Sequence, residues 1–281
     1  MNKDDLPTIP SDRLDDLHGL EIAETADLVL FMAGNQFMVM PEIVSAFQAQ
    51  YPEIKNIFYE TLPPGLALKQ ILAKGAKFQD RVLNVYPDIY SSVNYEAMQL
   101  LEKEGHIKPE GYHLYLHNRL TLMVPRGNPA KITSVRDLGR SDVRISQPDP
   151  ENEDIAHHIV DMYRQAGGDA LVDRIMAEKR AAGTTILTIV HHRETPLRIE
   201  KGTVDAGPVW ATEAVHARST RLAFDVIEPG AELDQRDRIN YYICMLQRAP
   251  HPENAQKFLK FILSSEGQKI YQTHGFLSRT P

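Results

Sequence analysis

The sequence predicts an α/β protein of two lobes joined by two crossing segments, and three observations carry this prediction. Short apolar stretches of strand length alternate with amphipathic stretches of helix length from residue 26 onward, an order typical of a mostly parallel sheet covered by helices. A strong strand signal over residues 119–125 starts a second series of the same kind. The chain then returns to the first series near residue 222. We therefore expect crossings near residues 113–118 and 219–224.

The first lobe is expected to combine residues 26–116 with residues 222–281. Three strand–helix pairs build its first part and two helices close the chain. The strands are expected at residues 26–33, 54–60 and 88–90, and the closing helices at residues 254–263 and from residue 264 onward. Residues 1–25 are polar and acidic with two prolines, and they are expected to form a loose leader.

Residues 117–221 are expected to form the second lobe. In it a strand over residues 143–146 precedes a helix over residues 154–165, which ends at a pair of glycines. A β-branched strand over residues 184–190 precedes a second helix, for which Thr195 is the expected N-cap, Pro196 the first helical residue and Gly202 the stop. A further strand is expected over residues 204–210.

Composition favours a binding role over catalysis. The 281 residues carry a net charge of −7, so the chain lacks the basic excess that a nucleic-acid or anionic-membrane binder needs. The sequence contains no glycine-rich phosphate motif, no hydrolase serine elbow and no paired zinc ligands. We therefore expect no catalytic residues, no cofactor and no resident metal. The single cysteine, Cys244, lies in an apolar run and is expected to be buried and inert.

The N-terminus lacks the basic and then apolar pattern of a signal peptide, and no apolar run is long enough to span a membrane. The sequence therefore leaves two interpretations open: a mature form from which a signal has been removed, or a cytosolic protein.

Polar and glycine residues follow the expected strands at the points where ligands bind in open α/β sheets. They are Asn35 and Gln36 after the first strand, Gly65 after the second, Ser146 in the second lobe, and His192 and Arg193 before the helix at Thr195. Free amides and the positive end of a helix dipole at such junctions favour an anion. A metal site formed by His191, His192 and Glu194 is the alternative at the last junction, whereas His157 and His158 are expected to be ordinary helix residues.

The order of these segments resembles the periplasmic molybdate-binding protein family, which has a type II periplasmic-binding-protein fold. The resemblance extends over residues 28–276 and is carried by residues 65–76, 87–92, 118–129, 202–212 and 252–268. It implies a two-lobe α/β fold with a central ligand cleft that closes about a hinge. It also implies a monomer that works outside the cytoplasmic membrane with an ABC-type permease. By resemblance, Trp210 occupies the position of a ligand-binding tyrosine.

Three departures from the family pattern bear on the ligand. Asn35 and Pro64 stand where the family has serines, and Trp210 stands where it has a tyrosine; residues 77–86 are an insertion. Proline offers neither a hydroxyl nor an N–H to an anion. We therefore predict weak binding of molybdate and tungstate, and better binding of another small anion.

The function predicted from the sequence is that of the extracytoplasmic solute-binding component of an ABC-type transporter. It is expected to hold a small anion, either a molybdate- or tungstate-like oxyanion or another small anion, through Asn35, Gln36, Gly65, Ser146, His192, Arg193 and Trp210. Two alternatives remain open: a cytosolic ligand sensor or enzyme on the same fold, and a metal-binding protein that uses His191 and His192.

Overall fold

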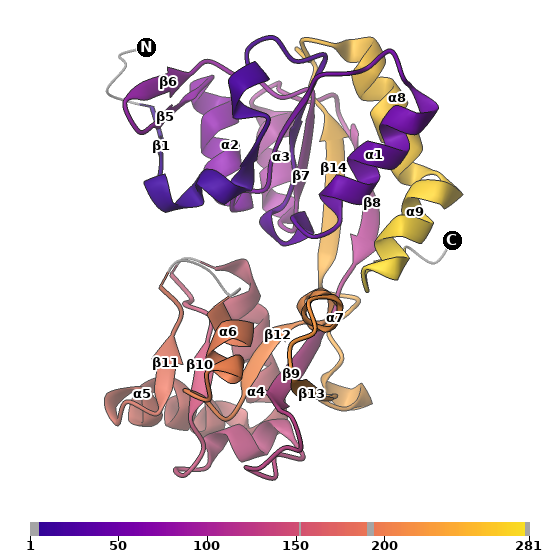
Figure 1. Ribbon diagram of the computed structural model, residues 1–281. Helices are drawn as coiled ribbons and strands as arrows, with labels where there is room; N and C mark the ends of the chain where they lie inside the picture. Colours follow the sequence, from indigo (N-terminus) through magenta and orange to yellow (C-terminus); the bar gives the residue numbers. More distant parts are fainter. Residues whose placement is uncertain (1–5, 152, 190–193, 279–281) are drawn as a thin grey trace. The chain divides into compact units, whose positions relative to one another are not determined.

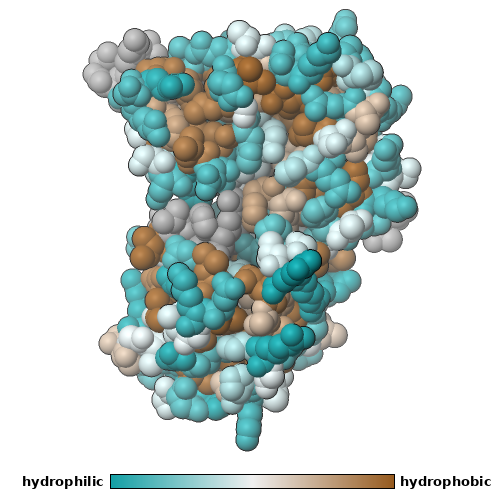
Figure 2. All heavy atoms as spheres, in the orientation of Figure 1, coloured by the Kyte–Doolittle hydropathy of each residue, from teal (hydrophilic) through white to brown (hydrophobic). Residues whose placement is uncertain are grey.

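The computed structural model describes residues 6–151, 153–189 and 194–278 (Figure 1). The chain forms two compact units: unit 1 comprises Met1–Leu116 and Asn240–Pro281, and unit 2 comprises His117–Ile239. Figure 2 shows polar side chains over much of the visible surface, with apolar patches between them. None of the helices in the described ranges is both long enough and apolar enough to cross a membrane.

Unit 1 is built on a seven-stranded sheet with the order β15-β8-β14-β7-β3-β4-β2. The central strands β3 (Leu28–Phe31), β4 (Ile57–Glu60) and β7 (Ile89–Ser92) are parallel, and β14 (Asn240–Met245) runs antiparallel to β7. The remaining strands of this sheet are β2 (Leu17–His18), β8 (Tyr112–His117) and β15 (Leu277–Ser278). All four side chains of β3 are buried, as expected for a strand covered on both faces.

Helices cover both faces of this sheet (Figure 1). One core cluster joins side chains of β3 and β4 to α2 (Pro64–Ala73) and α3 (Tyr95–Lys103). Phe47 of α1 (Met40–Gln50) packs against Phe258 and Phe261 of α8 (Pro252–Leu263), and α9 (Ser265–Thr273) follows α8. The predicted strand–helix order of this unit and its two closing helices are present in the structure.

The expectation of a loose leader is wrong. Within residues 6–25, β1 (Thr8–Ile9) pairs in parallel with β5 (Ala76–Phe78), and β2 adds an antiparallel edge strand to β4. The insertion over residues 77–86 supplies β5 and β6 (Arg81–Leu83), which form a hairpin. Ile9, only 1% exposed, and Leu17 anchor the leader in the core. Two-residue strands are too short for periodicity to reveal, so the polar composition of the leader misled the interpretation.

Unit 2 contains two small sheets. The strand β9 (Leu120–Pro125) lies between β12 (Gly207–Trp210) and β13 (Phe224–Ile227), antiparallel to both, while β10 (Ile145–Gln147) and β11 (Thr185–Leu187) pair in parallel. The helical elements are η5 (Val135–Gly139), α4 (Asp154–Asp173), η6 (Arg174–Glu178), α5 (Lys179–Ala181), α6 (Glu194–Glu200), α7 (Ala211–Ser219) and η7 (Ala231–Leu233).

Two details of unit 2 differ from expectation. The chain returns to unit 1 at Asn240 and not near Leu222, because β13 pairs with β9 and therefore stays in unit 2. The helix α4 continues to Asp173, although its regular geometry is interrupted at Gly167 and Gly168, where Gly168 has a φ of 71°. The predicted glycine break is therefore real, but it is a kink inside one longer helical element.

Candidate functional site

In unit 1 the site begins with Asn35, directly after β3. Asn35 lies in the short 3-10 helix η4 (Gly34–Gln36) and is 5% exposed. Its Nδ2 donates a hydrogen bond to the hydroxyl of Tyr241, whereas its Oδ1 is buried without a partner among the described residues. A buried polar atom left unsatisfied costs about 1–3 kcal/mol, so this position is arranged for something other than maximal stability.

Gln36 has a different environment. Its Nε2 donates to Ser91 Oγ at 3.0 Å and to Tyr115 Oη at 2.7 Å, and its Oε1 accepts from Tyr271 Oη at 2.8 Å. Burial raises the pKa of Tyr115 to about 12, so this phenol is neutral at physiological pH. Because both polar atoms of the Gln36 side chain are hydrogen-bonded within the protein, Gln36 stabilises the loop that carries Asn35.

The loop after β4 lies directly beside the Asn35 loop. A Cβ on Gly34 would come within 3.1 Å of the carbonyl oxygen of Thr61 and 3.3 Å of that of Leu62, so a larger residue would require these loops to move apart slightly. Gly65 follows as the second residue of α2 and is exposed. Its N–H donates to no described residue, as is usual in the first turn of a helix, and Pro64 has no N–H to offer. The Asn35 amide and the start of α2 thus share one edge of the unit 1 sheet.

In unit 2, Ser146 is fully buried inside β10. Its hydroxyl lies 2.8 Å from the hydroxyl of Thr195 and accepts a 3.1 Å hydrogen bond from Arg198. Thr195 is therefore not the N-cap that the sequence suggested, because α6 starts one residue earlier, at Glu194. Gly202 follows the end of this helix with a φ of 65°, as predicted for its stop.

Arg198 is the residue that sequence reasoning missed. Its guanidinium also donates to the carbonyl oxygens of Ile186 and Leu187, each at 2.9 Å, and to Glu194 Oε2 at 2.7 Å. It thereby ties α6 to β10 and β11. The four-residue spacing of Glu194 and Arg198 was the available signal, since such pairs lie on one helix face.

Trp210 lies at the end of β12 and is 2% exposed. Its ring packs against His158 of α4, with 5.9 Å between the ring centroids. Burial lowers the pKa of His158, so the imidazole stays neutral at physiological pH. His158 is thus a half-buried helix residue that packs against Trp210, in keeping with the expectation of an ordinary helix residue.

His191, His192 and Arg193 lie outside the described residues, so their predicted roles stay predictions. Glu194, the third member of the alternative metal site, already has a partner at each carboxylate oxygen. Its Oε1 accepts a hydrogen bond from the N–H of Ile189 at 2.8 Å, and its Oε2 forms an ion pair with Arg198. Within the described ranges no group of three acidic, histidine or cysteine side chains is placed to hold a metal ion.

Comparison with known proteins identifies the family to which this chain belongs. A family model described as bacterial extracellular solute-binding protein matches residues 28–277. The protein YvgL of Bacillus subtilis (strain 168), named as a candidate ABC transporter substrate-binding lipoprotein, is 23% identical over 190 residues, which cover 67% of this chain and 66% of YvgL. The chain therefore spans slightly less than two thirds of that relative.

Two solved structures share the fold. The sulfate-binding protein SubI of Mycobacterium tuberculosis H37Rv has a TM-score of 0.69 and 16% identity, covering 90% of this chain and 86% of that one. The periplasmic molybdate-binding protein of Azotobacter vinelandii has a TM-score of 0.68 and 15% identity, covering 90% and 99%. The predicted type II periplasmic-binding-protein fold is confirmed, as is the resemblance to this class.

Proposed function

Because the chain belongs to the bacterial extracellular solute-binding protein family, we propose that it is the solute-binding component of an ABC-type transporter and that its solute is a small anion. It binds and releases this solute without chemical change. The partner is a membrane permease, and the chain works as a monomer outside the cytoplasmic membrane.

The half-satisfied amide of Asn35 is the observation that carries the anion proposal. Rotation of the amide by 180° about Cβ–Cγ retains the bond to Tyr241, because a phenol hydroxyl can accept or donate. That rotation places the NH2 group where Oδ1 now lies, and from there it can donate to a negatively charged oxygen of the solute. A bound solute would thereby complete the hydrogen bonding of the Asn35 side-chain amide, one end of which has no partner among the described residues.

A second donor lies at the same sheet edge. The N–H of Gly65 belongs to the first turn of α2, a helix of ten residues, and the helix dipole adds positive potential there. Asn35 and Gly65 follow neighbouring parallel strands, in which Phe31 of β3 pairs with Glu60 of β4. An anion at this edge can therefore receive hydrogen bonds from both loops. In unit 2, His192, Arg193 and Trp210 are proposed as solute contacts, and Ser146 accepts a hydrogen bond from Arg198.

The hydrogen-bond donors proposed for the solute site suit an anion larger than molybdate. Pro64 supplies neither a hydroxyl nor an N–H, and each missing charge-assisted hydrogen bond to a desolvated anion costs about 1.5–3 kcal/mol. The longer side chains of Asn35 and Trp210 fit a less compact ligand, such as a small carboxylate or another oxyanion.

A thermal-shift screen against oxyanions, small carboxylates and divalent metals tests the proposal. A ligand present at 100 times its dissociation constant should stabilise the protein by about 2.7 kcal/mol. We expect a small anion to be the best ligand and Asn35→Ala to remove most of its effect, while Gln50→Ala, an exposed amide on α1, leaves it unchanged. Stabilisation by a divalent metal and by no anion would overturn the proposal in favour of a metal-binding protein.

A further inference from the structure

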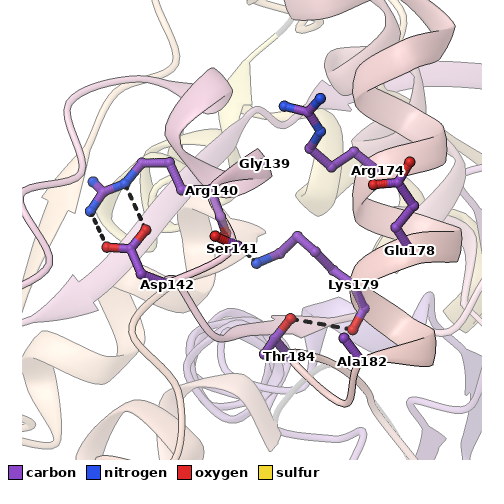
Figure 3. A pocket seen from close by; sticks show the side chains of 9 residues that line it. All are labelled: Gly139, Arg140, Ser141, Asp142, Arg174, Glu178, Lys179, Ala182 and Thr184. Carbon is purple, nitrogen blue, oxygen red and sulfur yellow. Dashed lines mark hydrogen bonds and ion pairs between the residues drawn. The ribbon is translucent and has the colours of Figure 1, made fainter.

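A pocket of about 580 Å³ lies in unit 2, away from the candidate solute residues described above. Figure 3 shows its lining, which comes from the turn after η5 and from the helical segment η6–α5. The turn contributes Arg140, Ser141 and Asp142, and the helical segment contributes Arg174, Glu178 and Lys179. A volume of this size lies in the range of small-molecule sites.

Lys179 is the unusual member of this pocket because it is only 4% exposed. Its ammonium group donates to the carbonyl oxygen of Arg140 at 2.5 Å and to that of Val143. In Figure 3 its side chain extends across the pocket toward Ser141. An ammonium group has three N–H donors, and these two carbonyls use two of them. They solvate the charge of Lys179 but do not neutralise it.

The two acids whose charges act on Lys179, Asp142 and Asp205, are already paired with other cations. Asp142 forms a two-pronged pair with Arg140, at 3.1 and 2.6 Å, and Asp205 pairs with Arg144 at 2.8 Å. Among the described residues no carboxylate forms an ion pair with Lys179. A buried cation without an anionic partner is costly, and this burial lowers the pKa of Lys179.

The helical wall of the pocket is also irregular. The five residues Arg174–Glu178 form a π-helical turn immediately before Lys179, and such turns occur frequently at functional sites. Gly139 lets the opposite wall approach closely, since a Cβ there would lie 2.7 Å from Leu171 Cδ1 and 3.4 Å from Arg174 Cδ. The exposed guanidinium of Arg174 forms no ion pair with a described residue. Glu178 offsets the charge of Arg174 and Asp142 offsets that of Arg140, so the excess positive charge of the pocket lining is that of Lys179.

We propose that this pocket is a second ligand site, distinct from the solute site, for a small singly charged anion that presents a negatively charged oxygen to Lys179 and Arg174. The hydroxyl of Ser141 is the neutral donor beside them. A small carboxylate and an inorganic oxyanion share this chemistry. The inference stands on unit 2 alone and does not depend on the proposed transport function.

Amide NMR spectra of the full chain, titrated separately with lactate and with sulfate, test this site. We expect saturable shifts of the Ser141 and Thr184 amides with a dissociation constant of about 1 mM or below, and tighter binding of lactate than of sulfate. Asn35→Ala should leave these shifts unchanged. Tighter binding of sulfate would assign the site to inorganic oxyanions, against the singly charged ligand proposed. The absence of saturable shifts at both amides would overturn the site.

Variants that each remove one positive charge distinguish a specific ligand site from general electrostatic attraction. Lys179→Met should abolish the saturable shifts. Because that variant also loses two hydrogen bonds and could fail to fold, Arg174→Gln provides the second test, with affinity weakened about threefold, as suits an exposed charge. Arg180→Gln removes the same charge from an exposed neighbour outside the pocket lining. Equal loss in Arg174→Gln and Arg180→Gln, or no loss in Arg174→Gln, would contradict the proposal.

Discussion

Gln70 Nε2 donates a 2.8 Å hydrogen bond to Oε1 of Glu60, and the other carboxyl oxygen of Glu60 is buried without a partner among the described residues. Glu60 is the last residue of β4 and is 1% exposed. Burial, reinforced by the negative charge of Asp16, raises the pKa of this carboxyl well above its usual range. The first unit therefore carries a buried acid that resists ionisation.

Glu60→Gln is expected to stabilise the protein at neutral pH, by about 1–3 kcal/mol. In the unfolded chain Glu60 is ionised above a pH of about 4.3, whereas in the folded chain its carboxyl group remains protonated. The free energy of unfolding of the native protein therefore falls relative to that of Glu60→Gln as the pH rises from about 4.3 through the raised pKa of Glu60. Urea unfolding at pH 4 and pH 8 measures the difference. It should be small at pH 4 and large at pH 8.

Glu53→Gln is the control for this prediction. Glu53 is exposed, and its hydrogen bond to Lys257 lowers its pKa, so its replacement should stabilise the protein at neither pH. Equal stabilities of the native protein and Glu60→Gln at pH 8 would show that Glu60 is ionised in the fold.

Ile9→Ala is expected to destabilise the protein by about 2–4 kcal/mol, because it removes a buried side chain from the leader that packs into the core of unit 1. Leu14→Ala, at a position 49% exposed in the same leader, should change the free energy of unfolding by less than about 0.5 kcal/mol. Chemical denaturation measures both. Similar effects of the two variants would mean that the leader is only loosely attached.

Gln36→Ala is expected to lower stability by about 2–4 kcal/mol, because it leaves the buried hydroxyls of Tyr115, Tyr271 and Ser91 with fewer partners. Asn35→Ala should cost little stability, since only one of its two amide atoms is bonded. Thermal unfolding of the two variants without solute separates these roles. A larger loss in Asn35→Ala would reverse the assignment of support and contact.

Arg193→Ala is expected to weaken solute binding at least tenfold, about 1.4 kcal/mol, with no loss of stability. Arg198→Ala should instead lower stability, because Arg198 joins α6 to β10 and β11. Binding and unfolding measurements on both variants distinguish a solute contact from an internal support. Unchanged affinity in Arg193→Ala would assign that loop to a structural turn.

Most of the fold follows from the sequence because long elements carry strong periodic signals. The apolar run of β3 and the strand signal of β9 both predicted elements that the structure contains. The pairing of β13 with β9 could not be predicted, since strand partners are set by tertiary packing and not by local pattern. The leader was missed for the same reason, because two-residue strands acquire their conformation only from β4 and β5.

The sequence predicted where candidate site residues lie, but not which of them are hydrogen-bonded within the protein. Strand ends identified Asn35, Gln36 and Ser146. The sequence could not show that Gln36 and Ser146 are hydrogen-bonded within their own units, while Asn35 has a buried amide oxygen without a partner among the described residues. Those differences depend on Tyr115 and Tyr271, which are distant in sequence from Gln36, and on Arg198, which is distant in sequence from Ser146.

Calorimetric titration with molybdate, tungstate, sulfate, phosphate and small carboxylates tests the central claim most directly. We expect one small anion other than molybdate or tungstate to bind with 1:1 stoichiometry at the solute site, and Asn35→Ala to weaken this binding at least tenfold, about 1.4 kcal/mol. Sub-micromolar binding of molybdate would contradict the argument from Pro64 and Trp210. Failure of every anion to bind at the solute site, with tight binding of an uncharged solute or a divalent metal, would contradict the assignment of an anion as the solute.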